Sequence, residues 1–301
     1  TILSTIPTNT TIMRTLFLSL LILFLPFCTY AQDKDKELPS KYSFAYGDTV
    51  RTYRMYLPAD LKSDAPLVVY THGYGSSKRW LPALNAVADT YGFAVCYPDG
   101  SPDSRGKDGW KVGYPPQESM KIDEGDFFGK LLEEVTGRFN LSRDNVFMAG
   151  MSNGGDLCYQ LAFTTPGLFK AYASVAGLAF EWLYDEYPAC EPVPFMEIHG
   201  NADRTSRWEG DPTNDGGWGK YLPVPEAVAR VVKSNECTTT ATDSMPTLKD
   251  PERLVKHTHY SGGKSGYDVE LYEIEGGKHS WGAKDLPTEE IIWKFFSRYM
   301  K

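Results

Sequence analysis

The chain has 301 residues, of which 42% are hydrophobic, and a formal net charge of −8. This acidic balance excludes the basic surface on which nucleic-acid binding depends, so we expect no nucleic-acid partner. About 270 residues remain once the N-terminal segment discussed next is set aside, and a chain of that length buries a large core as one domain.

Residues 1–31 have the pattern of a secretory signal peptide. One basic residue precedes an apolar run over residues 16–25, and Ala31 then offers a small residue at which cleavage is expected. Met13 is the expected start, and residues 1–12 are expected to be an upstream misannotation. The apolar run is too short to span a membrane. We therefore expect an extracytoplasmic protein, secreted or periplasmic, without a stable membrane span.

Export changes the interpretation of the cysteines. Cys28 leaves lipidation of the leader as an alternative. Cys96 and Cys158 lie in apolar segments and are expected to pack in the core. Cys190 and Cys237 lie in polar, loop-like sequence, and an oxidising compartment would allow them to pair. No cysteine spacing resembles a zinc site.

A linker over residues 32–42 is expected to lead into a single domain over residues 43–301. Strands are predicted at residues 50–57, 66–71, 93–97, 145–149, 171–176, 195–198 and 267–274, and helices at 80–91, 122–139, 156–163, 225–233 and 288–300. The first strand alternates and is expected to be an antiparallel edge strand, whereas the second is continuously apolar, as in a strand buried on both faces. The alternation of strands and helices predicts an α/β fold with a mostly parallel sheet covered by helices on both faces.

The sequence GMSNG over residues 150–154 matches G-x-S-x-G and lies between a predicted strand and a predicted helix. Strand, sharp turn and helix is the context of a nucleophile elbow. Gly150 and Gly154 would let neighbouring backbone pass closely, and Ser152 would stand at the start of a helix, where N–H groups favour developing negative charge. Because the motif recurs by chance, the rest of the chain has to support it.

A serine nucleophile needs a base and an orienting carboxylate, which in α/β-hydrolases follow in the order Ser, acid, His. Asp203 comes just after predicted strand 195–198, and His279 comes just after the last predicted strand. Asp211 and Asp215 lie deeper in the same loop and are alternatives to Asp203. Four other histidines occupy turns after their own strands or the wrong end of the last strand: His72, His199, His257 and His259.

An oxyanion hole requires two backbone N–H groups beside the nucleophile. The residue after the nucleophile, Asn153, is expected to supply one of them. The loop after predicted strand 66–71 is expected to supply the other, and we favour the N–H of Tyr74.

Residues 101–120 and 201–222 are long predicted loops, and loops of such length in a compact domain are usually functional. Aromatic side chains in loops at the carboxyl edge of the sheet suit a sugar ring or a feruloyl group. The expected substrate-binding residues are Trp110, Trp218, Tyr221 and Trp281. The alternative is that several of them, Trp281 included, simply pack the loops.

Together these segments resemble the secreted α/β-hydrolases of the polyhydroxybutyrate depolymerase and feruloyl/acetylxylan esterase type, carbohydrate esterase family 1 in the broad sense. The matching segments are HG at residues 72–73, YPDG at 97–100, GW at 109–110, the helix start near 122, GMSNGG at 150–155, HG at 199–200 ahead of Asp203, and HSW at 279–281. The resemblance implies the triad Ser152, Asp203 and His279, with no metal or organic cofactor.

Export and aromatic loops favour a feruloyl or acetyl ester of plant cell-wall polysaccharide as the substrate, with hydroxyalkanoate esters as the alternative. A serine peptidase of the prolyl-oligopeptidase type shares the elbow but usually carries a large additional domain, for which the segment ahead of the first core strand is too short. A catalytically inactive hydrolase fold used for binding is a third reading, and the ordered Ser, Asp and His argue against it.

Overall fold

The computed structural model describes residues 39–76 and 80–301. The predicted signal peptide, its cleavage site at Ala31 and the lipidation candidate Cys28 lie outside these residues. Among the described helices, none has the length and apolar character needed to cross a membrane.

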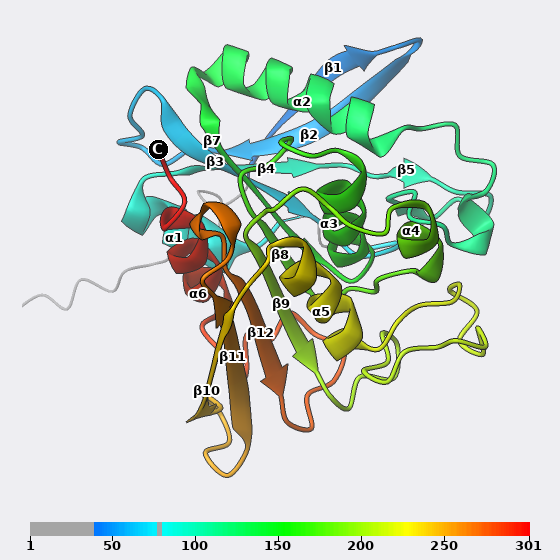
Figure 1. Ribbon diagram of the computed structural model, residues 1–301. Helices are drawn as coiled ribbons and strands as arrows, with labels where there is room; N and C mark the ends of the chain where they lie inside the picture. Colours follow the sequence, from blue (N-terminus) through cyan, green and yellow to red (C-terminus); the bar gives the residue numbers. More distant parts are fainter. Residues whose placement is uncertain (1–38, 77–79) are drawn as a thin grey trace, which may run out of the picture. The chain divides into compact units, whose positions relative to one another are not determined.

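A ten-stranded sheet forms the centre of the fold, in the order β1-β2-β4-β3-β7-β8-β9-β12-β11-β10 (Figure 1). Its strands are β1 (Ser40–Tyr46), β2 (Thr49–Tyr56), β3 (Ala65–Thr71), β4 (Ala94–Pro98), β7 (Leu141–Met151), β8 (Tyr172–Val175), β9 (Phe195–Gly200), β10 (Thr239–Pro246), β11 (Leu254–Ser261) and β12 (Val269–Ile274). The strands from β4 to β12 pair in parallel, and the two outer strands on each side pair antiparallel. All parallel strands therefore end at the same carboxyl edge.

Helices cover both faces of this sheet. They are α1 (Pro82–Tyr91), α2 (Glu124–Phe139), α3 (Asn153–Thr164), α4 (Glu181–Glu186), α5 (Val224–Ser234) and α6 (Thr288–Ser297), with short 3₁₀ turns η2 (Pro115–Gln117) and η3 (Lys264–Gly266). Val68 of β3 packs in the layer of α1 and α6, whereas its neighbours Leu67 and Val69 pack in the layer of α2, α3 and α5. This alternation confirms the predicted α/β architecture, because a strand buried on both faces sends successive side chains to opposite layers.

The differences from prediction lie at the sheet edges. β1 precedes the predicted edge strand and takes the edge position, and it starts at Ser40, inside the predicted linker. The outermost strand on the other side, β10, is almost wholly exposed. β10 buries little apolar surface, so its sequence lacks the apolar alternation that marks a half-buried strand, whereas β1 alternates and packs Tyr42, Phe44 and Tyr46 against the core.

The predicted pairing of Cys190 with Cys237 is wrong, because both thiols are free. Cys190 is buried, and its N–H donates to Ser234 Oγ at 3.2 Å. The Cys237 thiol faces Tyr267 O at 3.8 Å. Burial raises the pKa of both thiols, so each is less reactive than an exposed cysteine. Cys96 and Cys158 lie in the core as expected.

A candidate active site at the carboxyl edge of the sheet

Ser152 stands on a strained turn between β7 and α3. Its φ is 55° and its ψ is −121°, outside the regions that non-glycine residues normally adopt. An ideal Cβ at Gly150 would lie 2.1 Å from the carbonyl oxygen of Gly154, and one at Gly154 would lie 2.2 Å from that of Thr71. Only glycine fits either position, so the two glycines allow the tight turn that exposes the serine side chain.

The loops after β9 and β12 bring an acid and a histidine to the same place. The N–H of Ala202 donates to Gly277 O at 2.9 Å, and a Cβ at Gly200 would lie 2.3 Å from that oxygen. Because β9 and β12 are parallel neighbours, their carboxyl ends meet, and the glycines let the two backbones touch. Asp203 and His279 extend from these touching loops.

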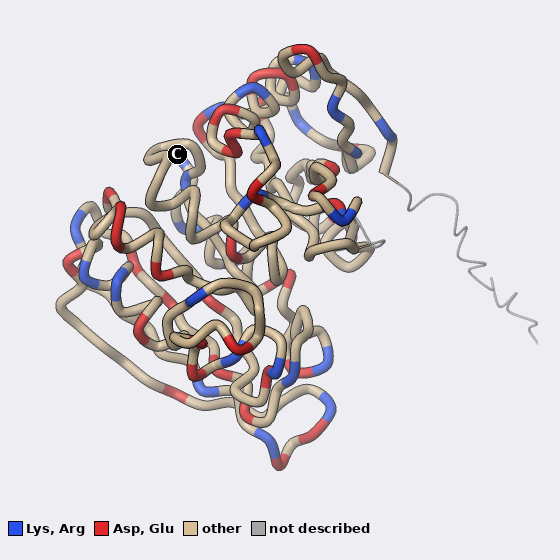
Figure 2. The backbone as a smooth tube through the Cα atoms, turned by 90° about the vertical axis from the view of Figure 1, so that its right-hand side faces the viewer, with Lys and Arg blue, Asp and Glu red and all other residues tan. Residues whose placement is uncertain are grey.

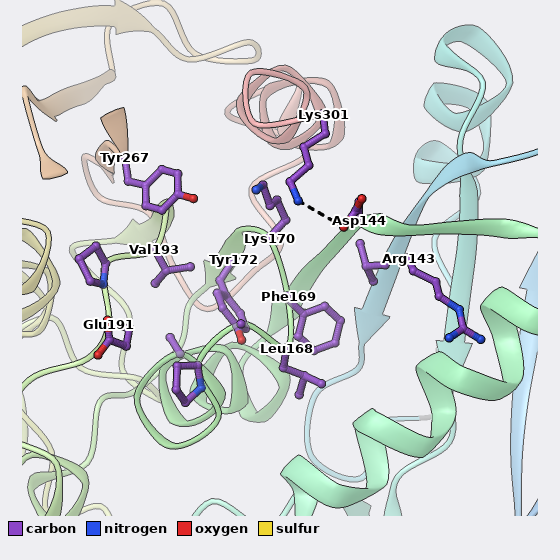
Figure 3. A pocket seen from close by; sticks show the side chains of 15 residues that line it. Arg143, Asp144, Leu168, Phe169, Lys170, Tyr172, Glu191, Val193, Tyr267 and Lys301 are labelled. Carbon is purple, nitrogen blue, oxygen red and sulfur yellow. Dashed lines mark hydrogen bonds and ion pairs between the residues drawn. The ribbon is translucent and has the colours of Figure 1, made fainter. Parts of the chain in front are cut away.

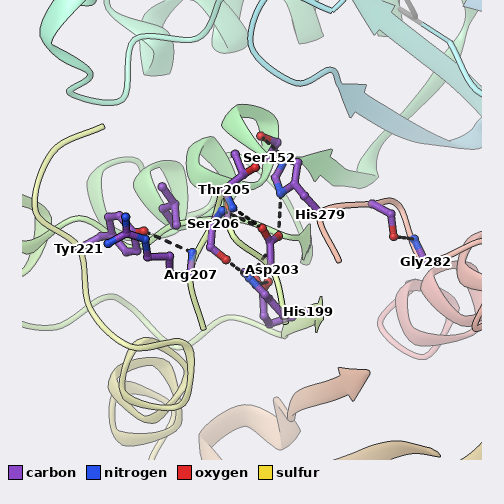
Figure 4. A network of polar contacts seen from close by, with 12 residues as sticks. Ser152, His199, Asp203, Thr205, Ser206, Arg207, Tyr221, His279 and Gly282 are labelled. Carbon is purple, nitrogen blue, oxygen red and sulfur yellow. Dashed lines mark hydrogen bonds and ion pairs between the residues drawn. The ribbon is translucent and has the colours of Figure 1, made fainter. Parts of the chain in front are cut away.

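Ser152, His279 and Asp203 form a continuous hydrogen-bonded chain (Figure 4). His279 Nε2 lies 3.0 Å from Ser152 Oγ, and His279 Nδ1 lies 2.7 Å from Asp203 Oδ2. The Asp203 side chain is fully buried, and the His279 side chain is 24% exposed. The imidazole can therefore exchange a proton with the serine on one side while a buried carboxylate orients it on the other.

Of the two alternative acids, Asp211 is buried and engaged elsewhere, and Asp215 is exposed. Asp211 accepts the N–H groups of Asp215 and Gly216 at 2.9 and 2.7 Å and so closes its own loop. The second oxygen of Asp203 accepts the N–H groups of Thr205 and Ser206 at 2.7 and 2.9 Å. Asp203 is thus the carboxylate that contacts the histidine, and its own loop fixes its orientation.

A buried histidine, His199, lies behind Asp203, and its partners were not predicted from sequence. His199 Nδ1 lies 2.8 Å from Glu197 Oε1, and His199 Nε2 donates to Ser206 O at 2.8 Å. Burial opposes protonation of His199, but the hydrogen bond and charge of Glu197 outweigh burial, so the pKa of His199 is raised. A glutamate inside an apolar strand, two residues before a histidine, was the available signal for this pair.

A buried carboxyl group at the first turn of α3 was also missed. Asp156 accepts the hydroxyl of Tyr114 and the N–H of Leu178, both at 2.6 Å. Burial raises the pKa of Asp156 to about 8, because the charged form loses its hydration. These contacts tie the start of α3 to two loops that come from distant parts of the chain.

The predicted oxyanion elements lie next to the serine. Asn153 is the first residue of α3, and N–H groups at a helix start have no acceptor within the helix. A Cβ at Gly73 would lie 3.4 Å from Ser152 Cβ, so the loop after β3 runs alongside the nucleophile. The N–H groups of Asn153 and Tyr74 remain the predicted donors.

Three of the four aromatic residues expected to bind substrate are buried in the packing of the loops, which corrects that prediction. Trp110 is 0% exposed and its indole donates to His72 O at 2.9 Å. The hydroxyl of Tyr221, 1% exposed, accepts the N–H of Arg207. Trp281 is 8% exposed and donates to Glu289 Oε1 at 2.9 Å. Each polar tip is satisfied internally, so the ring contributes to the core instead of offering a face to a ligand.

Trp218 is the one member of that group with a partly exposed side chain. Its ring centroid lies 5.8 Å from that of Tyr74 and 4.9 Å from that of Tyr114. Tyr74 is also partly exposed, and its hydroxyl donates to Asp103. Trp218 and Tyr74 thus pair beside the loop that approaches Ser152.

A cavity of about 230 Å³ lies far from this site (Figure 3). It opens beside Asp144 and Tyr172, at the amino ends of β7 and β8, where Lys301 Nζ pairs with Asp144 Oδ1 at 3.3 Å. Residues of β7 rise about 3.3 Å each, which puts the cavity roughly 25 Å from the serine turn. Basic and acidic residues are interspersed along the described backbone (Figure 2).

Comparison with known proteins agrees with the geometry. A protein of Nocardia uniformis subsp. tsuyamanensis described as an esterase, NocK, is 27% identical over 80% of this chain and 74% of its own. Feruloyl esterase D of Neurospora crassa is 23% identical over 83% of this chain and 82% of its own. The structure of an acetyl xylan esterase from Aspergillus awamori shares the fold, with a TM-score of 0.59 at 16% identity, and covers 86% of this chain and 99% of that one.

The family model of Esterase PHB depolymerase matches residues 51–205, a segment that contains β3, the serine turn and Asp203. This match covers more than half of the chain and agrees with the strand order, the elbow and the relatives. The chain therefore belongs to the Esterase PHB depolymerase family and is an esterase with the α/β-hydrolase fold.

Proposed function

We propose that the protein hydrolyses carboxylic esters through a catalytic triad of Ser152, His279 and Asp203. The observation that carries this proposal is the pair of contacts at 3.0 and 2.7 Å that joins the three side chains at a strained turn. A strained serine persists only where surrounding structure enforces it, and such strain clusters at functional sites.

In the first half of the reaction, Ser152 Oγ attacks the ester carbonyl carbon while its proton passes to His279 Nε2. Asp203 holds the Nδ1–H of the imidazole and stabilises the imidazolium that forms. The oxyanion of the tetrahedral intermediate accepts the N–H groups of Asn153 and Tyr74. The C–O bond of the alcohol then breaks, and His279 Nε2–H donates its proton to the departing oxygen.

In the second half, a water molecule takes the place of the alcohol. His279 accepts a proton from this water as its oxygen attacks the acyl-enzyme carbonyl. The second tetrahedral intermediate collapses, the bond to Ser152 Oγ breaks, and the imidazolium returns its proton to the serine. The products are one carboxylic acid and one alcohol, and the enzyme is regenerated.

The substrate class we favour is a feruloyl or acetyl ester of plant cell-wall polysaccharide. A feruloyl esterase among the relatives and an acetyl xylan esterase among the similar folds support it. Trp218 and Tyr74 add partly exposed aromatic surface beside the serine loop. An exported enzyme would meet such polymers outside the cytoplasm, and residues 1–31 have the pattern for export. Hydroxyalkanoate esters are the second candidate, because the name of the matching family refers to polyhydroxybutyrate (PHB) depolymerase.

The test is hydrolysis of four substrates by the mature chain: methyl ferulate, p-nitrophenyl acetate, acetylated xylan and a 3-hydroxybutyrate oligomer. We expect ferulate or acetylated xylan to have the highest kcat/KM, and Ser152→Ala to lower kcat by about 10⁴ or more. Ser244→Ala, at an exposed position on β10, is the control and should be unchanged. Preference for the hydroxybutyrate oligomer would replace the substrate class, and activity in Ser152→Ala would contradict the triad.

A further inference from the structure

One short segment connects the two sides of the proposed oxyanion hole. The ribbon strand β6 (Asp108–Gly109), which pairs with β5 (Ser101–Pro102), is followed by Trp110, and this residue is fully buried. Trp110 contacts the first residue of α3 through its backbone and the loop after β3 through its side chain. These are the two elements that would supply the oxyanion donors.

The contact with α3 is a paired hydrogen bond. The backbone N–H of Trp110 donates to Asn153 Oδ1 at 2.7 Å, and Asn153 Nδ2 donates to Trp110 O at 3.0 Å. Asn153 is 0% exposed, so no water competes for these bonds. The amide side chain is locked against Trp110 of the ribbon loop, and this fixes the backbone of the residue whose N–H would face the oxyanion.

The contact with the other side is made by the indole. Trp110 Nε1–H donates to His72 O at 2.9 Å, and the two rings lie 5.2 Å apart. His72 is held in turn by Gly100, whose N–H donates to His72 Nε2 at 3.1 Å. Gly73 and Tyr74 follow His72 in the chain and run past Ser152. A fixed His72 carbonyl therefore fixes the position of the Tyr74 N–H two residues later.

The ribbon loop is itself held tightly. A Cβ at Gly109 would lie 2.7 Å from Asn153 Oδ1 and 3.1 Å from the Tyr74 ring, so only glycine fits between these two residues. The N–H of Gly75 donates to Asp108 O at 2.7 Å. Gln117 Nε2 donates to Trp110 O at 2.7 Å. The bond from Gly75 joins the ribbon loop to the loop after β3, and the bond from Gln117 ties it to the turn η2.

We propose that Trp110 is a positioning residue, which sets the separation of the Asn153 and Tyr74 N–H groups and so shapes the oxyanion hole. This inference rests on the proposed function. Oxyanion donors act when they lie about 2.7–3.1 Å from the developing charge, and a misplacement of about 1 Å can cost about a hundredfold in rate. A residue that binds both walls controls that distance without touching the substrate.

The first test is Trp110→Phe, which keeps an aromatic ring but removes the indole N–H. With p-nitrophenyl acetate, kcat should fall about ten- to a hundredfold while KM stays within about twofold. The inhibition constant of a trifluoromethyl ketone, whose hemiketal oxygen occupies the oxyanion position, should rise by a similar factor. Trp293→Phe is the matched control, because Trp293 is buried on α6 and stacks on Phe93 at 4.0 Å, away from the site.

The second test is Asn153→Leu, which removes the paired hydrogen bond but retains the backbone N–H. We again expect a lower kcat, a nearly unchanged KM and a weaker ketone inhibition. The fold-loss of kcat in the double variant should be smaller than the product of the two single losses, because both substitutions disturb the same contact. This variant decides the question if Trp110→Phe does not fold, as judged by its Tm.

Two results would overturn the inference. One is an unchanged kcat and ketone affinity in a folded Trp110→Phe or Asn153→Leu protein. The other is a raised KM with unchanged kcat, which would indicate direct contact with substrate. Ser152→Ala distinguishes the positioning role from the proposed function. An inactive Ser152→Ala together with a normal Trp110→Phe refutes only the positioning role. An active Ser152→Ala refutes the proposed function.

Discussion

Two regions of the protein pair histidine with carboxylate, and only one of them has the surroundings for catalysis. At the carboxyl edge, His279 bonds to Asp203 and also reaches Ser152 on its strained turn. In the antiparallel extension of the sheet, formed by β10 and β11 beside β12, His257 of β11 lies 3.1 Å from both Asp243 and Glu270. Similar histidine–carboxylate pairs can thus have a catalytic or a structural role within one chain.

The difference lies in what occupies the other side of the imidazole. Both ring nitrogens of His257 face carboxylates, and its ring stacks on Tyr272 at 4.2 Å. Glu270 also bonds to Arg298, the residue that follows α6, so the cluster joins the outer strands to the end of the last helix. A histidine between two acids stabilises a junction, whereas a histidine between an acid and a strained serine can transfer a proton.

The largest expected effect comes from the active-site pair. Asp203→Asn should lower kcat by about 10⁴ with little change in KM, because the amide no longer holds the histidine in the reactive tautomer. Steady-state kinetics with p-nitrophenyl acetate measures this. Asp268→Asn, which alters the carboxylate 2.9 Å from His259, is the matched change in the other region and should leave kcat within about twofold. Equal losses in both variants would remove the distinction between the regions.

Gly154→Ala tests the close packing under the serine turn. The added Cβ would lie 2.2 Å from Thr71 O, so we expect a loss of about 3 kcal/mol or more in the free energy of unfolding, together with loss of activity. Gly129→Ala, in α2 with no atom within 4 Å of the new Cβ, should instead stabilise by about 0.5–1 kcal/mol. Urea unfolding measures both, and a neutral Gly154→Ala would show that the turn is not constrained as described.

Glu270→Gln tests the cluster in the extension. Burial raises the pKa of Glu270, but His257 and Arg298 outweigh burial and lower it to about 2. Its stabilising contribution is therefore complete above the ordinary pKa of 4.5 and is lost as pH falls from there towards 2. We expect Glu270→Gln to cost about 2 kcal/mol at pH 7 with unchanged kcat, and the difference from wild type to shrink in acid.

The matched control is Glu273→Gln on the same strand, where the carboxylate lies 3.9 Å from Lys256 and is more exposed. Such pairs are worth less than about 1 kcal/mol. A loss in Glu270→Gln that does not exceed this control at pH 7 would contradict a structural role for the cluster.

The smallest expected effect is the pH dependence of His257→Gln. Burial lowers the pKa of His257, but Glu270 and Asp243 more than compensate, so the pKa is raised above its ordinary 6.5. A raised pKa means that the stabilisation is complete below 6.5 and is lost as pH rises through the raised value. The variant should thus be less stable than wild type at pH 5.5, and the difference should decrease at pH 8.5. An equal difference at both pH values would contradict the sign.

The core of the fold and the meeting of Ser152, Asp203 and His279 could be anticipated because each depends on local signals. Buried parallel strands are continuously apolar, the elbow needs glycines, and the acid and histidine follow strand ends in a fixed order. The roles of the aromatic residues could not be anticipated in the same way. Trp110 and Tyr221 lie in polar, glycine-rich loops, yet tertiary contacts bury them completely.

The extension escaped prediction for the opposite reason. β10 is almost entirely exposed, so its sequence carries no apolar face to mark it as a strand. The pairing of Cys190 with Cys237 failed because compartment and polarity say nothing about whether two side chains meet. Glu197 was missed because its position two residues before His199 in an apolar strand is a weak signal, which does not by itself show that the two side chains meet.

The most direct test of the central claim is covalent labelling of the nucleophile. The mature chain would be treated with a fluorophosphonate, and the modified peptide identified by mass spectrometry. We predict about one label per chain, carried by Ser152, no label in Ser152→Ala, and much slower labelling in Asp203→Asn. A label on another serine, or rapid labelling of Ser152→Ala, would contradict the assignment of Ser152 as the nucleophile of this esterase.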